Sequence, residues 1–476
     1  MRLLAAVLAT ALAAAPALAQ APAAPPPAKA PAGDGQGLGK AALGEIKGSF
    51  PADPANRALM NAVSNNDLKD LSYNREIYNS YDDIFSDNVT AKGITNQKSS
   101  GRCWMFAGLN MMRPVVIEKF KLESFEFSEN QLFFWDKLEK ANTFLGAVIE
   151  TAGRDIDDRE LQALLVSPVP DGGWWNYAVD LIDKYGVVPK EVSQETKHTS
   201  STGRMNAVLD RMARADAVEL RKMAAGGADS GALDARKLDM MKEFYRVLVL
   251  HMGWPVEEFT WRVKDKDGAI HEKSYTPKSF YGEAVGIDLR DYVAVVDYPA
   301  FPYNAYYEVN YCRGMYDRPD MGFINLETAE LKKYAMRAIQ ENEPVWFSAD
   351  IGKENDGDNG ILAPGMYDYE SLLGTGHDLT KADFIRYREG SPNHAMVFVG
   401  VDVKDGKPVK WRVENSWGTD RGNKGYWTMY DEWFSDYVFN VIVHKKHIPE
   451  KIVKLLDTEP VRIPAWDPMR SAFDQR

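Results

Sequence analysis

The feature that most constrains the fold is a hairpin pattern near the C-terminus, in residues 394–418. An apolar run (HAMVFVGVDV) is followed by an Asp-Gly turn signal (KDGKP) and by an alternating stretch (VKWRVENSWG). This order is typical of a buried strand, a tight turn and a returning strand. A turn centred near Gly406 brings the start of the first strand close to the end of the second. We therefore expect His394 and Asn415 to be neighbours in space.

Cys103 is one of only two cysteines, and it stands where a helix should begin. The preceding QKSSGR is a polar loop, whereas CWMFAGLNMMRPVVIEKF carries apolar residues at helical spacing. The unpaired amides and the positive dipole end of a helix N-terminus stabilise a thiolate, so we expect a lowered pKa for this thiol. Pro114 should end or kink the helix. A structural cysteine gains nothing from this position, which favours a reactive one.

A reactive cysteine needs a base, and the predicted hairpin supplies one. His394 can act as the base, and Asn415 can accept from one ring nitrogen so that the other faces the thiol. Trp417 could shield that hydrogen bond from water. Gln97 could donate its side-chain amide to a developing oxyanion beside the backbone N–H of Cys103. The set predicts a Cys-His-Asn site that attacks an amide carbonyl.

The second cysteine and one further histidine offer alternatives to this assignment. Cys312 lies in a Tyr-rich stretch and is interpreted as a buried small hydrophobic residue; a disulfide with Cys103 is the alternative. His377 is a rival base, but no Asn follows it in a strand. The chain has no HExxH, paired CxxC or Walker pattern, so neither a metal nor a cofactor is predicted.

Several motifs resemble a known family. QKSSGRCW, HAMVFVGV and WRVENSWG resemble the papain-like cysteine peptidases. FSENQLFFWDKLEK, DGGWWNYAVDLIDKYGVVPK, EPVWFSADIGK and DEWFSDYVFNVIVHKKHIPE are similar to its bleomycin hydrolase and aminopeptidase C branch. The resemblance runs from about residue 48 to the C-terminus. It implies Cys103 as nucleophile, His394 as base, Asn415 as orienter and Gln97 as oxyanion donor.

The resemblance also implies the fold. The expected class is α+β, a two-lobed papain-like peptidase with a helical lobe and a β-barrel-like lobe. His394 follows Cys103 by about 290 residues, whereas papain-sized enzymes need about 130–150. The extra length implies helical and hook-like insertions, roughly over residues 140–345, which would assemble six subunits into a ring.

Substrate contacts are implied in the same way. Asp171, Gly172 and Gly173 resemble the glycine strand that pairs with the substrate backbone, where glycine allows close approach. A C-terminal tail, residues 464–476, is expected in the cleft. The carboxylate of Arg476 would then bind the free amine of a peptide.

The N-terminal composition predicts export. Residues 1–19 have a positive start, an apolar run and an A-x-A cleavage site, as a signal peptide does. Residues 20–43 are biased to Ala, Pro and Gly and are expected to be a disordered linker, and 44–476 would be the peptidase domain. No later run is apolar enough to span a bilayer, so a periplasmic or secreted protein is expected.

The function predicted from these features is an exported cysteine aminopeptidase that removes N-terminal residues through an acyl-enzyme. Two alternatives stay open: an endopeptidase or amide-specific hydrolase that uses the same site, and a non-catalytic assembly module. The net charge of −12 argues against nucleic acid as a partner. Peptides with free N-termini are the expected substrates.

Overall fold

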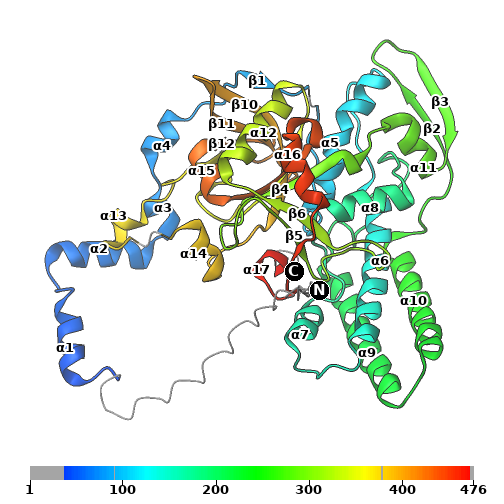
Figure 1. The fold of residues 1–476 in the computed structure, drawn as a ribbon. Coiled ribbons are helices and arrows are strands. Elements are labelled where there is room, and N and C mark those ends of the chain that lie inside the picture. The colour runs from blue at the N-terminus through cyan, green and yellow to red at the C-terminus, as the bar shows by residue number, and fades with distance from the viewer. Residues whose placement is uncertain (1–36, 91, 377–378, 472–476) are drawn as a thin grey trace, which may run out of the picture. The chain divides into compact units, whose positions relative to one another are not determined.

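A computed structural model describes residues 37–90, 92–376 and 379–471 (Figure 1). The chain divides into two compact units, Met1–Leu68 and Lys69–Arg476. The predicted signal peptide and His377 lie outside the described residues. None of the helices in the described ranges has the length and apolar character of a membrane span.

The first unit contributes two described helices, α1 (Lys40–Gly48) and α2 (Pro54–Asn65). Helix α1 begins inside the range 20–43 that was expected to be a linker. Neither helix has a buried residue.

The helical part of the second unit contains the helix that Cys103 begins. Its main helices are α5 (Cys103–Lys119), α6 (Glu129–Glu150), α7 (Arg159–Val166), α8 (Trp175–Tyr185), α9 (Gly203–Ala225) and α10 (Ser230–Met252). Helices α9 and α10 stand side by side and pack against α6 (Figure 1). They lie within the range predicted for insertions.

The other part is a twelve-stranded mixed sheet among the described residues, in the order β14-β5-β6-β4-β13-β7-β10-β11-β12-β9-β8, with β1 paired to β10. The bounds are β1 (Asp87–Asn88), β4 (Tyr292–Val296), β5 (Ala305–Val309), β6 (Met321–Asn325), β7 (Val345–Ala349), β8 (Asn355–Asp356), β9 (Ile361–Leu362), β10 (His394–Lys404), β11 (Lys407–Glu414), β12 (Tyr426–Tyr430), β13 (Val438–His444) and β14 (Val461–Ile463). Strands β4 to β6 fall within the range 140–345, so part of that range belongs to the central sheet.

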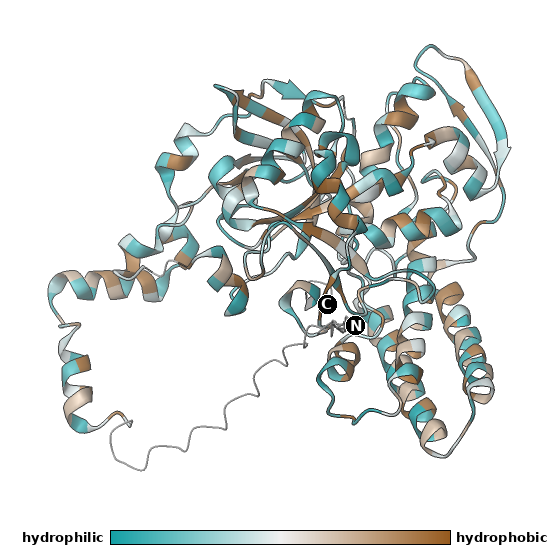
Figure 2. Ribbon diagram, in the orientation of Figure 1, coloured by the Kyte–Doolittle hydropathy of each residue, from teal (hydrophilic) through white to brown (hydrophobic). Residues whose placement is uncertain are grey.

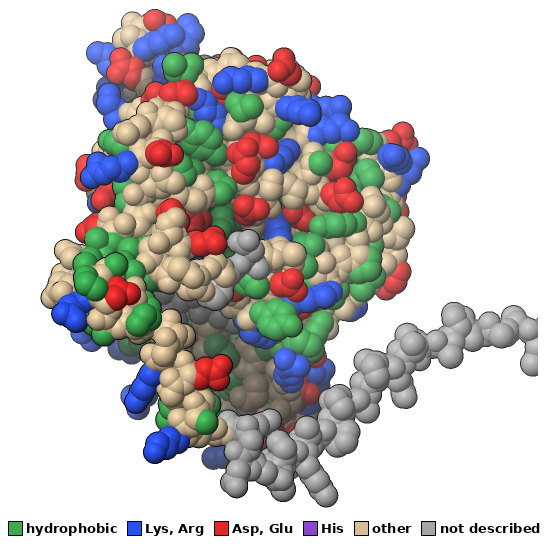
Figure 3. Space-filling view, turned by 90° about the vertical axis from the view of Figure 1, so that its left-hand side faces the viewer, with side chains coloured by type: hydrophobic (Ala, Val, Ile, Leu, Met, Phe, Trp, Pro, Cys, Tyr) green, Lys and Arg blue, Asp and Glu red, His purple; other side chains and the backbone are tan. Residues whose placement is uncertain are grey.

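The remaining elements connect or cover these two parts. They are α3 (Leu68–Ser72), α4 (Arg75–Ser80), α11 (Pro277–Phe280), α12 (Thr328–Gln340), α13 (Tyr369–Leu373), α14 (Lys381–Arg386), α15 (Asp431–Tyr437), α16 (Glu450–Val453), α17 (Pro468–Ser471), the turns η1 (Tyr281–Val285), η2 (Leu289–Asp291), η3 (Lys445–His447) and η4 (Lys454–Asp457), and a separate hairpin of β2 (Phe259–Lys264) and β3 (Ile270–Tyr275). Figure 2 shows apolar colour along the central strands and a mostly hydrophilic β2–β3 arm. Figure 3 shows acidic and basic side chains intermingled over one face.

The predicted C-terminal hairpin is confirmed as β10 and β11, with Lys404 opposite Lys407. The two residues between them, Asp405 and Gly406, have φ values of 53° and 76°. Two successive positive φ angles are the mark of a type I′ turn, whose twist suits a hairpin. The local turn residues therefore align the two strands that carry His394 and Asn415.

Tertiary packing modifies what the local sequence favours at two helices, α5 and α6. Helix α5 continues through Pro114 to Lys119, so Pro114 does not end it. Because α5 is buried on most of its surface, packing offsets the lost backbone bond. Ser128 caps α6 by accepting from Gln131 N at 3.2 Å, which is half of the S-x-x-Q capping box that the sequence favours. The Gln131 side chain instead bonds Val256, so only half of a capping box forms.

Candidate active site

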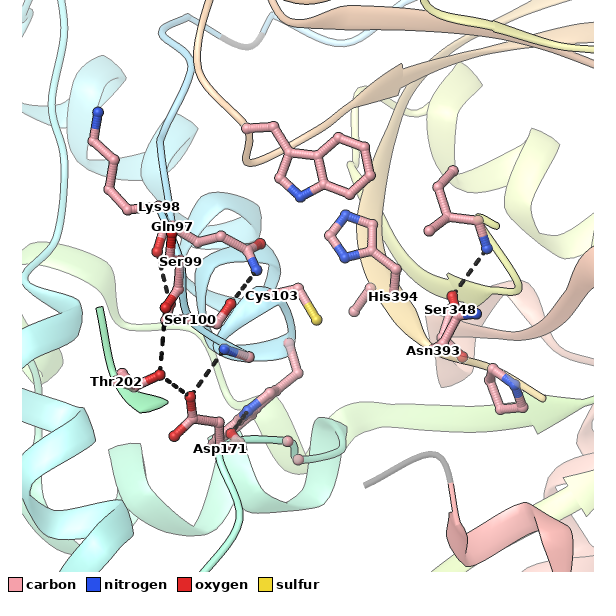
Figure 4. A pocket seen from close by; sticks show the side chains of 18 of the residues that line it. Gln97, Lys98, Ser99, Ser100, Cys103, Asp171, Thr202, Ser348, Asn393 and His394 are labelled. Carbon is pink, nitrogen blue, oxygen red and sulfur yellow. Dashed lines mark hydrogen bonds between the residues drawn. The ribbon is translucent and has the colours of Figure 1, made fainter. Parts of the chain in front are cut away.

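The nucleophile predicted from the sequence lies in a cleft between the two parts of the second unit. Cys103 is the first residue of α5 and is half-buried. The cleft has a volume of about 670 Å³. Figure 4 shows Gln97, Cys103 and Asp171 on one side and His394 and Asn393 on the other.

The imidazole of His394 is held in one orientation and one tautomer. Its Nε2 lies 2.8 Å from Asn415 Oδ1. The same Oδ1 accepts the backbone N–H of Ser416 at 2.8 Å, which identifies this atom as the amide oxygen. An oxygen partner requires Nε2 to carry the proton, so Nδ1 keeps its lone pair. Figure 4 shows the imidazole and the Cys103 sulfur facing the same cleft.

Trp417 covers the His394–Asn415 pair. Its ring centroid is 4.7 Å from that of His394, at 33° between the planes. Asn415 is 1% exposed and His394 is 6% exposed. Exclusion of water strengthens the hydrogen bond that orients the imidazole.

Gln97 is placed as an oxyanion donor requires. Its Oε1 accepts from Ser416 Oγ at 2.6 Å, and its Nε2 donates to Ser100 O at 2.6 Å. The second N–H of Nε2 remains for a ligand. The backbone N–H of Cys103 stands at a helix N-terminus, where donors lack intrahelical partners. Gln97 and Cys103 line the same cleft.

Burial shifts the pKa values of Cys103 and His394. For Cys103 it opposes the lowering that a helix N-terminus alone would cause. Burial raises the pKa of the Cys103 thiol to about 11, although N–H groups of Ala395 and Trp104 act to lower it. Burial lowers the pKa of His394 to about 4, against the hydrogen bond of Asn415. Burial thus favours the neutral form of each group when it is considered alone. Water in the open cleft weakens the shift on the half-buried thiol.

Proton transfer from Cys103 to His394 creates both charges together. Two unit charges about 4 Å apart attract by about 4 kcal/mol at an effective dielectric constant of about 20. This attraction offsets part of the desolvation that opposes each charge alone. A Cys103 thiolate would therefore be favoured more as one member of an ion pair with His394 than alone.

Asp171 lines the cleft, but its carboxylate is engaged by the protein. Oδ1 pairs with Lys137 Nζ at 2.7 Å, and Oδ2 accepts from Gly101 N at 3.0 Å and Thr202 Oγ1 at 2.5 Å. Although burial alone would raise the pKa of Asp171, the Lys137 charge and these hydrogen bonds hold it well below its usual value. Its side chain fixes the loop before the nucleophile, a role that the sequence pattern did not reveal.

The two glycines after Asp171 do line the cleft as expected. A Cβ on Gly173 would lie 2.4 Å from the indole of Trp104, so glycine is also required for packing. Trp104 Nε1 in turn donates to Asp171 O at 2.8 Å. Trp104, the residue after Cys103, thus packs against Gly173 and is hydrogen-bonded to Asp171 in the cleft wall.

Arg102 is a supporting residue that sequence reasoning missed. It is fully buried, and its guanidinium binds both carboxylate oxygens of Glu195, at 3.1 and 2.8 Å. It also donates to Thr199 O at 2.7 Å and Ser100 Oγ at 3.0 Å. A charged residue directly before a buried helix is the signal that could have identified it.

The other candidate residues have simpler outcomes. Cys312 is buried, and neither cysteine forms a disulfide within the part of the chain that the structure describes, so the disulfide alternative is wrong. Arg476 lies outside the described residues. The described start of the tail, up to Ser471, is anchored: Met469 is fully buried, and Tyr298 Oη donates to Asp467 at 2.6 Å.

One cluster outside the cleft has side chains of metal-ligand type. Ligand atoms of Glu341, Glu343 and His447 lie within 4.8 Å of one another. Lys446 Nζ forms ion pairs with Glu341 at 3.0 Å and with Glu343. Both carboxylates are already engaged by Lys446, so the cluster is an ion-pair network.

Comparison with known proteins agrees with this geometry. The Peptidase C1-like family matches residues 38–470. The chain belongs to this family. It is a cysteine-type peptidase, which confirms the predicted enzyme class.

Its relatives support the narrower resemblance. Bleomycin hydrolase of Rattus norvegicus is 39% identical over 446 residues, which cover 91% of this chain and 98% of that protein. Aminopeptidase C of Streptococcus thermophilus is 38% identical over 426 residues, 89% of this chain and 96% of that protein. The crystal structure of PepW from Lactobacillus rhamnosis HN001 has a TM-score of 0.89 at 37% identity and covers 91% of this chain and 99% of that one. The papain-like fold class is thereby confirmed.

Proposed function

We propose that this peptidase is an aminopeptidase that works through an acyl-enzyme. The observation that carries the proposal is the His394–Asn415 hydrogen bond of 2.8 Å, which leaves Nδ1 of His394 unprotonated on the side of Cys103. A base in this state can take the thiol proton as sulfur attacks. The similarity to aminopeptidase C supports the N-terminal selectivity.

In the first half of the reaction, Cys103 Sγ bonds to the carbonyl carbon of the substrate and its proton passes to Nδ1 of His394. The carbonyl oxygen becomes an oxyanion and accepts from Gln97 Nε2 and from the N–H of Cys103. His394 then gives its proton to the leaving amine as the C–N bond breaks. The product of this half is a thioester on Cys103.

In the second half, water attacks the thioester carbon. His394 takes a proton from that water, and the C–S bond breaks. The proton returns to sulfur, and the amino acid leaves. The same donors stabilise the second oxyanion, since it forms at the same place.

Selectivity for a free N-terminus is proposed to depend on the chain that follows α17. Arg470 lines a small cavity of about 50 Å³ that Lys140 also lines. Lys140 Nζ donates to Gly172 O, which belongs to the cleft wall. The anchored segment thus ends close to the cleft. Residues beyond Ser471 would close one end of it to longer chains.

The test is hydrolysis of two matched peptides, one with a free N-terminus and one N-acetylated, under reducing conditions. The full chain should cleave only the free peptide, and Cys103→Ala should cleave neither. A variant truncated after Ser471 should also cleave the acetylated peptide. Cleavage of both peptides by the full chain would make the enzyme an endopeptidase. Cleavage of neither by any variant would favour the non-catalytic alternative.

Export is proposed from the N-terminal sequence, where Ala17-Leu18-Ala19 follows an apolar run. Expression of the full chain in a bacterium should place a form that begins at Gln20 outside the cytosol, as measured by intact mass. A chain that keeps Met1 and stays in the cytosolic fraction would contradict this. The six-subunit ring also stays a prediction, and a monomer mass in light scattering would overturn it.

A further inference from the structure

Helix α6 carries buried charged residues that the reaction does not use. Lys137 is 0% exposed, Lys140 4% and Asp136 1%. Lysine is almost never fully buried unless it is paired. The two lysines are three residues apart and therefore lie on one face of the helix.

Both lysines bind the segment that forms one wall of the cleft. Lys140 Nζ donates to Pro170 O at 2.9 Å and to Gly172 O at 2.7 Å, and it pairs with Asp136 Oδ2 at 2.8 Å. Lys137 Nζ donates to Val169 O at 2.8 Å. These contacts are in addition to the Lys137–Asp171 ion pair. Three backbone carbonyls of residues 169–172 thus accept hydrogen bonds from the ammonium groups of the two lysines.

We propose that Lys140 is a positioning residue whose ammonium group holds the wall 169–173 in place and so sets how tightly the enzyme binds a peptide. The inference rests on the proposed function and on the expectation that Gly172 and Gly173, which line the cleft, pair with the substrate backbone. Lys140 acts through backbone carbonyls and does not touch the reacting atoms. Lys137 differs from Lys140 because its partner Asp171 also accepts from the N–H of Gly101, so Lys137 additionally holds the loop that precedes Cys103.

The position of the wall 169–173 should depend on the protonation state of Lys140. An ammonium group has three N–H donors, and Lys140 has three acceptors. The neutral amine has two, so deprotonation releases one acceptor and removes the attraction to Asp136. Burial lowers the pKa of Lys140 to about 8, although the charge of Asp136 raises it.

The charged and aromatic groups around Lys140 come from several elements. Asp136 and Lys137 share its helix, Asp171 lies on the wall, and Arg313 and Arg470 line the small cavity beside it. The rings of Trp104 and Tyr177 lie 5.2 and 5.6 Å from Nζ. Asp136 is ionised at neutral pH, because burial raises its pKa only to about 6.

The expected pH effect separates substrate binding from stability. The folded-state pKa of Lys140 is below the value of about 10.4 for an unfolded lysine. Between pH 8 and about 10.4 the unfolded chain binds more protons, so this group makes the fold more stable as pH rises. A loosened wall above pH 8 is therefore not alkaline unfolding.

The experiment measures KM and kcat from pH 6.5 to 9.5 for the wild type, Lys140→Met and Lys140→Arg with one free-amine peptide. The peptide's own amine titrates near pH 8, so the informative quantity is the ratio of variant to wild-type KM at each pH. We expect Lys140→Met to raise KM about tenfold at pH 7 with kcat within about twofold. This ratio should fall at least twofold by pH 9.5, where the wild type has lost its proton. For Lys140→Arg, which stays charged, the ratio should also fall as pH rises, because only the wild-type KM increases.

Lys332→Met is the matched control. Lys332 Nζ also donates three hydrogen bonds, to Asp431 O, Asp431 Oδ2 and Ser435 Oγ, none of which belongs to the cleft. It should leave KM unchanged while it lowers the thermal midpoint as Lys140→Met does. Alkylation of Cys103 by iodoacetamide should proceed at the wild-type rate in both variants.

The results that would overturn this inference differ from the result that would contradict the proposed function. A wild-type KM for Lys140→Met, or an equal rise in the Lys332→Met control, would overturn the inference while the proposed function stands. If Lys140→Met does not fold, the comparison of Lys140→Arg with the wild type takes its place: a ratio without pH dependence overturns the proposal. Absence of hydrolysis by the wild type would instead contradict the proposed function.

Discussion

Arg102→Met should destabilise the fold by about 3–5 kcal/mol, as expected when one partner of a buried ion pair is removed. The guanidinium is fully buried, and its removal leaves the mostly buried Glu195 with only the more distant Lys190 Nζ, at 3.5 Å, as a charged partner. Thr199 O and Ser100 Oγ lose their donor as well. Urea unfolding measures the loss. Activity should fall with it, because Ser100 also binds Gln97.

The double variant Arg102→Met, Glu195→Met is the control for this result. Replacing both members of a buried pair by apolar residues is often neutral, so it should recover most of the stability. It should not recover activity, since the loop before Cys103 still lacks its anchor. A double variant as unstable as the single one would contradict the account, and so would a single variant within about 1 kcal/mol of the wild type.

The pair also has a defined pH dependence. Although burial alone would raise it, the Arg102 charge and its hydrogen bonds hold the pKa of Glu195 below its usual value. A depressed folded-state pKa means that this stabilisation is present above the unfolded value of about 4.3 and is lost as pH falls through the folded value. The stability difference between wild type and Arg102→Met should therefore shrink below about pH 4.

The parts of the site that sequence could predict are those determined by local rules. The Asp405-Gly406 turn aligns two strands, and that alignment alone makes His394 and Asn415 neighbours. The position of Cys103 at a helix start follows from apolar periodicity in the same way. Such features need no knowledge of distant contacts, because turn type and helix period are set by a few adjacent residues.

What could not be predicted depends on contacts between distant parts of the chain. Glu195 meets Arg102 across 93 residues, and Lys140 meets Gly172 across 32. No periodicity relates such partners. The engagement of the Asp171 carboxylate by Lys137 could not be predicted for the same reason, while substrate binding by the backbone of Asp171 stays a prediction. The effect of burial, a tertiary property that raises the pKa of Cys103 against the local helix terminus, could not be predicted either.

Gln97→Ala should lower kcat by about 10²–10³-fold, the usual loss when one oxyanion donor is removed. The free N–H of Gln97 Nε2 acts only after the carbonyl oxygen becomes charged, so KM should change much less than kcat. Steady-state kinetics on a free-amine peptide measures both. The alkylation of Cys103 by iodoacetamide forms no oxyanion and should keep its rate.

Two further variants separate this role from a structural one. Gln97→Glu keeps the shape and can still accept from Ser416 Oγ, but it places an acceptor where the oxyanion needs a donor, so its kcat should be at least as low. Ser416→Ala removes only the bond to Gln97 Oε1 at 2.6 Å and should cost about tenfold or less. If Ser416→Ala were as damaging as Gln97→Ala, the glutamine would act by holding the loop. If Gln97→Glu were fully active, the oxyanion would be stabilised by backbone N–H groups alone.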